Sequence, residues 1–396
     1  MDLEYRSVPD DRREEFHDLL HYAFRLEDGH SEYDPEDLPG EVGARRGLFD
    51  GNDLAVVCSH YWFDAQVRGT WVPAPGLSAV ASPPEHRHKG YIAHLLEESL
   101  REYRERGSVL SVLWPFKYSF YRKYGWDTCS RFSKITVEPD HLAFLQEDAS
   151  GEFRRASADE WATLDEIYRA DATDRDLAID RSEEFWRHRV FEGWEKDPFA
   201  YVWEEDGDPR GYVIYTVESD DDGKTFQVYD LAATDETAFR NTLRFLYYHE
   251  AQVGSVSIRG PPDARLLDRL PEQWDVDCEV SRGPMARIVD ISTAVEALDY
   301  PTELQGSIRI GVDDPLVEWN DGTFEISFED GTATCRPVED DPSVELSMAA
   351  LSQLYVGYRS LKRLRREADV VVHDEAAADV LHRAFPPRDV FLREGF

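Results

Sequence analysis

The stretch 80–125 constrains the fold more than any other part of the chain, because it holds a complete strand–turn–helix–strand unit. It reads VASPPEHRHKGYIAHLLEESLREYRERGSVLSVLWPFKYSFYRKYG. The apolar run 76–81 predicts a strand that leads into the turn. The run 92–104 predicts an amphipathic helix, and 109–113 is apolar except for Ser111, as in a buried central strand. The helix has its apolar residues at Ile92, Leu95, Leu96 and Tyr103.

The turn between this strand and this helix gathers cations in a chain that is otherwise acidic. Arg87, His88 and Lys89 precede Gly90, and the helix follows at once. A helix N-terminus leaves about four N–H groups unpaired and carries roughly half a positive charge. Glycine lets that backbone approach a ligand closely, so the turn suits a pyrophosphate. A solvated turn is the alternative interpretation.

The charge balance excludes some functions. The 396 residues include 44 Lys and Arg against 81 Asp and Glu, a formal net charge of −37, with few lysines among the basic residues. This haloarchaeal-type composition indicates a halophilic protein, in which carboxylates hold water and a Debye length of ~3 Å at 1 M screens their repulsion. An acidic surface for a basic partner is the alternative. No basic face is apparent, so nucleic-acid binding is not expected.

The remaining composition indicates a globular, cytoplasmic protein with no membrane association. Aromatic residues make up 12% of the chain, which is enough to build cores. No apolar segment follows Met1 and no run of about 18 apolar residues occurs. The four cysteines show no framework spacing and are expected to be reduced and packed. They are Cys58, Cys129, Cys278 and Cys335.

Further along the chain, helices and strands alternate in two more blocks. Helices are expected at 15–25, 158–171, 183–190, 236–249, 347–356 and 375–385. Strands are expected at 47–57 with a turn at 50–53, and at 65–72, 200–203, 211–216, 226–231, 253–259, 306–312, 323–329 and 331–336. The strand-to-helix turn at 232–235 lacks glycine and cations, so the second block is expected to be structural. The run 362–366 is basic and is interpreted as a solvated helix face, with anion binding as the alternative.

These motifs together resemble the GNAT-type N-acetyltransferases and, more narrowly, the Eis-like (enhanced intracellular survival) acetyltransferases. The resemblance lies in Gly76-Leu77-Ser78, Val80-Ala81, His86-Arg87 with Gly90, Phe120-Tyr121 with Tyr124-Gly125, and the terminal Phe396. It implies an α+β fold with tandem mixed-sheet GNAT domains followed by a sterol-carrier-protein-like α/β domain. The implied boundaries are 1–148 for the GNAT domain with the acetyl-CoA site, 149–289 for a degenerate GNAT domain and 290–396 for the third domain. A homo-oligomer, a hexamer by resemblance, is also implied.

The resemblance assigns roles to particular residues. Tyr121 is the expected general acid, and the carboxylate of Phe396, delivered by the third domain, is the expected general base. The backbone of Val80, Ala81 and Ser82 is expected to hold the pantetheine and thioester of acetyl-CoA. The pyrophosphate contacts are expected from His88 to Ala93 and from Arg87, and Phe116 and Lys117 are expected to lie alongside. These cofactor-binding residues are Val80, Ala81, Ser82, Arg87, His88, Lys89, Gly90, Tyr91, Ile92, Ala93, Phe116 and Lys117.

Some positions depart from the family pattern or admit a second interpretation. Ile92 stands where the superfamily prefers Gly or Ala, and the bulky stretch 114–118 is expected to narrow the acceptor pocket. Phe24 and Glu394 are candidate substrate-binding residues. Tyr121 lies among other aromatic residues and would also suit a core. The aromatic residues Phe24, Trp62, Phe63 and Trp71 line either an acceptor pocket or the core. His86 and His88 have no third ligand nearby, so no metal is expected.

Acetyl transfer to an amine fits these residue types. A phenol with a reference pKa of about 10 can protonate a thiolate, and a carboxylate near aromatic side chains becomes a better base. The sequence therefore predicts an acetyl-CoA-dependent N-acetyltransferase for a primary amine, which is a polyamine, an aminoglycoside-like amine or a lysine of a peptide. A long-chain acyltransferase is a second possibility. A different class of protein, an acyl-CoA-binding sensor or lipid carrier with a vestigial site, is the alternative.

Overall fold

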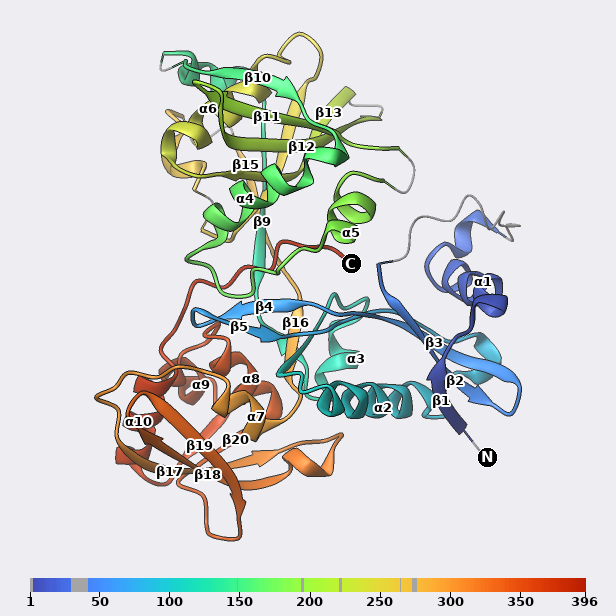
Figure 1. Cartoon of the computed structure of the whole chain (residues 1–396), viewed down its shortest axis with the longest axis vertical. Helices are drawn as coiled ribbons and strands as arrows, with labels where there is room; N and C mark the ends of the chain where they lie inside the picture. The colour runs from blue at the N-terminus through green and yellow to red at the C-terminus, as the bar shows by residue number, and fades with distance from the viewer. Residues whose placement is uncertain are drawn as a thin grey trace. The chain divides into compact units, whose positions relative to one another are not determined.

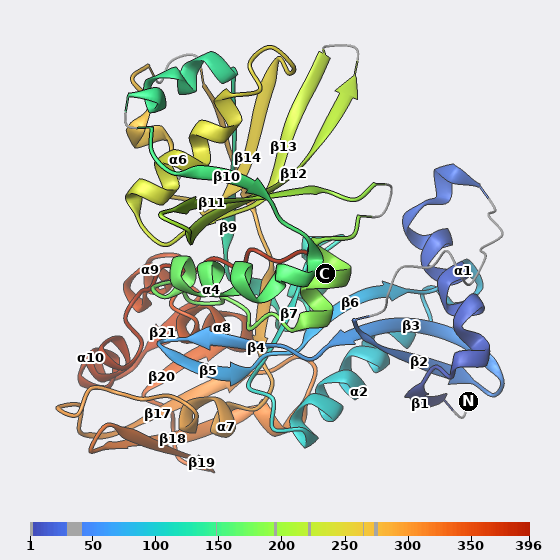
Figure 2. The same cartoon turned by 45° about the horizontal axis from the view of Figure 1, so that its top comes forward.

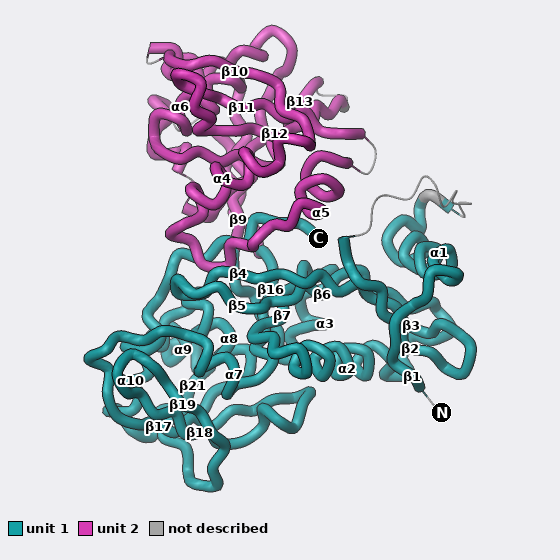
Figure 3. The backbone as a smooth tube through the Cα atoms, in the orientation of Figure 1, with its two compact units in different colours: residues 1–130, 283–396 teal, residues 131–282 magenta. Residues whose placement is uncertain are grey.

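The computed structural model describes residues 3–29, 42–147, 149–193, 196–220, 223–263, 265–272 and 276–396. Contacts divide the chain into two compact units, which Figure 3 colours separately. One unit contains residues 1–130 and 283–396, and the other contains residues 131–282. Each unit is described by itself.

The first unit opens with a seven-stranded sheet in the order β1-β2-β3-β6-β7-β16-β8 (Figure 1). Only β6 and β7 run parallel, and the other neighbours are antiparallel. The strands are β1 (Leu3–Ser7), β2 (Ala44–Asp50), β3 (Asp53–Tyr61), β6 (Gly76–Ala81), β7 (Leu110–Leu113), β8 (Asp127–Thr128) and β16 (Met285–Ile288). This first sheet is therefore completed by a strand that comes from far along the chain.

Two helices cover opposite faces of the first sheet, α1 (Arg13–Phe24) and α2 (Tyr91–Glu105) (Figures 1 and 2). Neighbouring residues of β3 divide between the two faces: Val57 packs with Phe16 of α1, and Val56 packs with Leu95 of α2. This alternation is the period of a strand that is buried on both sides. Gly107 follows the C-cap of α2, and its φ of 73° lies in the left-handed region that commonly ends a helix.

A buried polar cluster fixes α2 to the strands beneath it. The Glu102 carboxylate accepts hydrogen bonds from Arg46 Nε at 2.8 Å and Nη2 at 2.6 Å, and from the Tyr5 hydroxyl at 2.7 Å. Burial by itself raises the pKa of Glu102, but the hydrogen bonds from Arg46, His60 and Tyr5 hold it well below its usual range. Burial lowers the pKa of His60, which is fully enclosed. The cluster therefore holds an ionised carboxylate against the buried guanidinium of Arg46, and the more exposed Arg106 pairs with the same carboxylate at 3.0 Å.

The remainder of the first unit is a five-stranded C-terminal sheet in the order β19-β18-β17-β20-β21. One face is buried through residues such as Ile310 and Ile326, and the other face is more exposed. The strands are β17 (Gly306–Asp313), β18 (Gly322–Glu329), β19 (Thr332–Val338), β20 (Val344–Ser347) and β21 (Val370–Val372). The helices are α7 (Ile291–Glu296), α8 (Met348–Tyr355), α9 (Leu361–Arg366) and α10 (Glu375–Ala384).

Helix α8 joins the C-terminal sheet to the first sheet. Ser352 accepts from the backbone N–H of Ile288 at 2.9 Å, and Gln353 donates to the carbonyl of Thr128 at 2.8 Å. A hairpin of β4 (Asp64–Val67) and β5 (Thr70–Pro73) reaches the same helix. Its turn residue Arg68 donates to the carbonyls of Leu354 and Tyr355 at 2.9 and 2.8 Å. These two bonds tie the hairpin to the C-terminal end of α8.

The second unit is a seven-stranded sheet in the order β10-β11-β12-β13-β14-β9-β15. Strands β13 and β14 run parallel and are connected through α6, as β6 and β7 are connected through α2. The strands are β9 (Arg131–Val137), β10 (Glu152–Arg155), β11 (Phe199–Glu205), β12 (Asp208–Asp220), β13 (Gly223–Ala233), β14 (Ser255–Gly260) and β15 (Asp277–Arg282). The helices are α4 (Trp161–Ala172), α5 (Glu183–Phe185) with a π-helical turn at Trp186–Val190, and α6 (Glu236–Tyr247).

The mixed α and β architecture expected from the sequence is confirmed, and three local expectations differ from the structure. The single strand expected at 65–72 is the β4–β5 hairpin, because Arg68 and Gly69 both adopt positive φ and turn the chain. The helix expected at 183–190 becomes a π-helical turn after Phe185. Cys278 is exposed rather than packed. The basic run 362–366 lies in α9, and Arg363 and Arg365 pair there with Glu367 and Glu375.

Candidate active site

The site is built where β6 and β7 separate. The two strands share one register pair, Gly76 with Val112, at the start of β6. Beyond it, β6 carries an extra residue against β3, because Val57 faces Ala81 while Ser59 faces Ser78. Ala79 has φ of 54°, the left-handed region that disfavours side chains. A bulge of this kind bends a strand and re-aims its backbone groups, so β6 diverges from β7 along Val80, Ala81 and Ser82.

The cationic turn follows the end of β6. His88 and Gly90 both adopt positive φ, 62° and 81°, and Gly90 is the N-cap of α2. Gly90 supplies no side chain to the N-terminal N–H groups of α2. Arg87 and Lys89 are exposed, and Arg87 Nε donates to the Ser82 carbonyl at 3.1 Å. The turn therefore presents an open helix N-terminus with two cations, as the sequence predicts.

The corresponding helix of the second unit begins differently. Asp235 is the N-cap of α6, and its carboxylate accepts from the backbone N–H of Ala238 at 3.0 Å. Arg210 pairs with the same carboxylate. A negative side chain already occupies the N-terminus where an anion would bind. This agrees with the structural role expected for the turn at 232–235.

Tyr121 lies in the short helix α3 (Tyr118–Arg122), a few residues after β7. Its side chain is 3% exposed and packs edge-to-face against Phe116, Phe120 and Trp126. Burial raises the pKa of Tyr121, and the nearby Cys58 adds to the rise. The phenol is therefore protonated at neutral pH, the state that a general acid requires.

The C-terminal tail returns to the same strands. The Glu394 carbonyl accepts from Trp114 Nε1 at 2.7 Å, directly after β7, and the Ser130 hydroxyl donates to the Val390 carbonyl at 3.2 Å. The Phe396 ring packs against Phe63 and Tyr61 with centroid separations of 5.1 and 5.5 Å. The tail is thus docked on the first unit, and its last residue reaches the start of β6.

Glycine at position 76 makes room for this last residue. A Cβ atom there would lie 2.6 Å from Cε2 of Phe396 and 2.8 Å from Cε2 of Phe63. Real Cβ atoms do not approach ring carbons so closely, so any side chain at this position displaces a ring. Gly76 therefore pairs with Val112 of β7 and also leaves space in which the Phe396 ring packs.

The structure brings most of the predicted residues onto this one region. The buried residues Val80, Ala81, Ser82 and Tyr91 belong to β6, to the segment after it and to the start of α2, with Ile92 and Ala93 half-buried beside them. Phe116 and Lys117 are exposed between β7 and α3, and Glu394 is buried in the tail. Phe24 is 51% exposed at the end of α1, and its substrate role stays a prediction. Phe63 packs on Phe396, and Trp62 stacks with Arg106.

Several contributing residues were not identified from the sequence. Ala79 has no special residue type, so its left-handed conformation gave no signal. The bulk of Trp114 does not indicate its hydrogen bond to the tail, and the motif that contains Gly76 does not indicate that Phe396 packs there. A glycine at the first position of a buried strand is a usable signal of close approach. The described part of the chain contains no cluster of three or more His, Cys, Asp or Glu residues suited to a metal ion.

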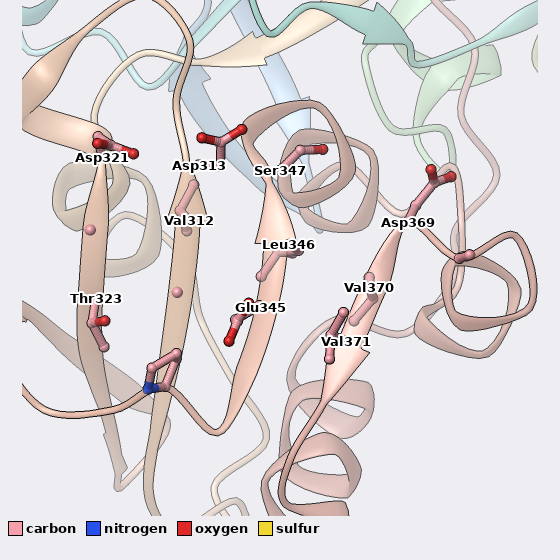
Figure 4. A pocket seen from close by; sticks show the side chains of 14 residues that line it. Val312, Asp313, Asp321, Thr323, Glu345, Leu346, Ser347, Asp369, Val370 and Val371 are labelled. Carbon is pink, nitrogen blue, oxygen red and sulfur yellow. The ribbon is translucent and has the colours of Figure 1, made fainter.

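A hollow of about 450 Å³ lies on the exposed face of the C-terminal sheet (Figure 4). It spans β17, β18, β20 and β21, and its lining includes the carboxylates of Asp313, Asp321, Glu345 and Asp369. Sites for acyl chains are lined mainly by apolar side chains. The lining mixes these carboxylates with apolar side chains such as Val312, Leu346 and Val370, and is not the mainly apolar lining of an acyl-chain site. No helix in the described residues is long and apolar enough to cross a membrane.

Comparisons with known proteins match all three parts of the chain. Residues 4–129 and residues 177–288 each match a model of an acetyltransferase (GNAT) domain, and residues 291–393 match a sterol carrier protein domain. The chain is 23% identical over 331 residues to an uncharacterized N-acetyltransferase of Streptomyces avermitilis, covering 80% of each. It is 24% identical over 336 residues to the N-acetyltransferase Eis of Mycobacterium tuberculosis, covering 80% of this chain and 79% of that protein.

A solved structure shows the same fold over the full length. The crystal structure of a GCN5-related N-acetyltransferase from Anabaena variabilis superposes with a TM-score of 0.86 at 22% identity, covering 100% of each chain. The two GNAT matches together span more than half of the chain. The fold of two such domains followed by a sterol-carrier-like domain is therefore shared along the whole length.

Proposed function

Because this chain belongs to the GNAT family of N-acetyltransferases, whose members use acetyl-CoA, we propose that its site lies at the divergence of β6 and β7 and acetylates a primary amine. The observation that carries the proposal is the convergence of an open cationic helix start, a buried tyrosine and the chain terminus on these two strands. The acceptor is a polyamine, an aminoglycoside-like amine or a peptide lysine.

The residues present fit acetyl-CoA, which supplies an acetyl group held as a thioester. The open N-terminus of α2, with exposed Arg87 and Lys89, suits a pyrophosphate because N–H dipoles and two cations face an anion. The diverging edge of β6 at Val80 to Ser82 offers backbone groups to the pantetheine. Phe116 and Lys117 are exposed beside it.

Proton movement is assigned to the two ends of the site. The terminal carboxylate of Phe396 removes a proton from the acceptor ammonium, directly or through water. Tyr121 holds its proton because burial raises its pKa, and it donates that proton to the departing sulfur. Transfers of this kind each contribute on the order of 10²–10⁴ in rate.

The role proposed for the last domain is to deliver the C-terminus to the site. Its helix α8 and tail are bonded to the first sheet, and the tail ends with Phe396 packed on Gly76. The domain division at 148/149 and 289/290, the cytoplasmic location, the adaptation to salt and the hexameric assembly belong to the same proposal. They rest on composition and resemblance.

Thiol release from acetyl-CoA tests the proposal, measured in high KCl with polyamines, aminoglycosides and lysine peptides. The native chain is expected to release thiol only when an amine is present, and Tyr121→Phe is expected to lower kcat while acetyl-CoA still binds. Tight acetyl-CoA binding without amine-dependent release would favour a sensor or carrier instead. Long-chain acyl-CoA donors in the same assay separate acetyl transfer from longer acyl transfer.

A further inference from the structure

The helix that carries Tyr121 is too short to hold its own position. Helix α3 spans five residues, Tyr118–Arg122. Isolated helices shorter than about 12 residues are marginal in water, because nucleation fixes several residues for a single hydrogen bond. The location of the Tyr121 hydroxyl must therefore be set by contacts from outside the helix.

One such contact comes from Arg287 on β16, whose side chain is fully buried. Its Nη1 donates to the carbonyl of Tyr124, in the turn that follows α3. The guanidinium also lies 5.1 Å from the ring centroid of Trp126. Gly125 has φ of 89°, and a Cβ atom there would clash with Nη1. The turn after α3 is thus shaped around this guanidinium.

The other terminal nitrogen of Arg287, Nη2, is held by Asp314, the residue directly after β17 of the C-terminal sheet. Nη2 pairs with Asp314 Oδ2 at 2.5 Å, and the Asp314 side chain is also fully buried. The other oxygen, Oδ1, accepts from the backbone N–H groups of Leu316 at 2.9 Å and Val317 at 3.2 Å. A buried carboxylate with this many partners has one orientation, and it therefore fixes the guanidinium that it binds.

The start of α3 is held from the neighbouring strand. Asp127 on β8 accepts from the Tyr118 hydroxyl, and its other oxygen lies 3.3 Å from Arg122 Nε. Asp127 also accepts from its neighbour's backbone N–H at 2.7 Å. Residue 127 faces Ala286 across the sheet, one position before Arg287. Strand β8 therefore contacts the first and last residues of α3 through Asp127, and strand β16 contacts the turn after α3 through Arg287.

We infer that Arg287, anchored by Asp314, is a positioning residue that holds Tyr121 at the reacting centre. The inference rests on the proposed function and extends it. The C-terminal domain then supports the site in two ways, through the tail that ends at Phe396 and through Asp314. Arg287 touches neither reactant in this account and acts only through α3.

A double-mutant cycle tests the inference in the full-length protein. Arg287→Lys keeps a cation beside Asp314 but loses the planar fork that reaches both partners. It is expected to lower kcat about 10- to 100-fold, as small misplacements of reacting groups do, with KM for acetyl-CoA unchanged. In the Tyr121→Phe background the same change is expected to have little further effect, because the two residues act as one unit.

Hydrogen exchange provides a readout that does not depend on activity. Arg287→Lys is expected to speed exchange in residues 118–125. The matched control is Arg181→Lys in the second unit, where Arg181 is equally buried and pairs with Asp230 at 2.6 Å. That control is expected to lower the free energy of unfolding without changing kcat or exchange at 118–125. If Arg287→Lys does not fold, Asp314→Asn replaces it, because it keeps the Arg287 side chain and removes the charge that anchors it.

The outcomes separate this inference from the proposed function. Non-additive losses in kcat with faster local exchange support it. Additive losses, or unchanged exchange at 118–125, overturn it while the native activity stands. A native protein that releases no thiol with any amine overturns the proposed function, and with it any catalytic role for Arg287.

Discussion

The ring of Phe396 packs where Gly76 has no side chain, and a Cβ atom at that position would lie 2.6 Å from the ring. Gly76 is also the one residue of β6 that pairs in register with β7. The last residue of the chain therefore packs on the strand pair at which the candidate site is proposed.

Gly76→Ala tests this seating. The added methyl group displaces the Phe396 or Phe63 ring, so we expect kcat to fall about 10- to 100-fold and the free energy of unfolding to fall by about 1–3 kcal/mol. Acetyl-CoA affinity, measured by calorimetry, is expected to change little. Gly254→Ala is the control, because its nearest neighbour is the Lys224 carbonyl oxygen at 3.9 Å. Equal kinetics for the two variants would contradict the seating.

The pH dependence of kcat follows from the burial of Tyr121. Burial raises its pKa above the usual value of about 10, so the phenol keeps its proton through the neutral and mildly alkaline range. We expect kcat to show no alkaline decline below about pH 10 in the steady state. A decline centred near pH 8, in enzyme shown to be stable at that pH, would mean that another group is the acid.

The same shift has a consequence for stability. A group whose pKa is raised on folding adds stability below its unfolded pKa and loses it as pH rises. The free energy of unfolding of the native protein is therefore expected to fall above about pH 10 more steeply than that of Tyr121→Phe. Urea unfolding at a series of pH values measures the difference, and parallel curves would show that Tyr121 titrates normally.

Glu102 predicts how the free energy of unfolding changes at acidic pH. Its hydrogen-bonded carboxylate has a lowered pKa, so its contribution is present above the unfolded value of about 4.3 and is lost as pH falls. We expect Glu102→Gln to lower the free energy of unfolding by about 3 kcal/mol at pH 7, because Arg46 stays buried without its countercharge. The control Glu97→Gln on the same helix removes an exposed pair with Arg101 and is expected to cost less than about 1 kcal/mol. A difference between the two variants that persists undiminished at pH 3 would contradict this assignment.

The local parts of the site were predictable from the sequence, and the long-range parts were not. The strand at Gly76–Ala81 and the helix starting at Tyr91 follow from hydrophobic period and from the turn residues between them. The partners of these elements come from distant segments. Strand β16 pairs Met285 with Leu113, and no local pattern marks a four-residue strand for that position. The sequence alone therefore gives no reason to single out Arg287.

The tail shows the same limit in a different form. Its apolar residues predict that it packs, and Leu392 is fully buried. The partner surface depends on how two sheets are joined through α8 and on the bond from Trp114 to the Glu394 carbonyl. Such contacts are set by tertiary packing and leave no local pattern in the sequence. The role of the Phe396 carboxylate as a base is therefore implied by the family resemblance and not by residue spacing.

Deleting Phe396 tests whether the terminal carboxylate is the general base. Amine-dependent thiol release and acetyl-CoA binding would be measured for the native chain and for the chain ending at Gly395. We predict that kcat falls on the order of 10²–10⁴-fold while acetyl-CoA binding is retained, because the carboxylate no longer reaches the acceptor ammonium. Full activity in the shortened chain would contradict the account and assign the base to another group.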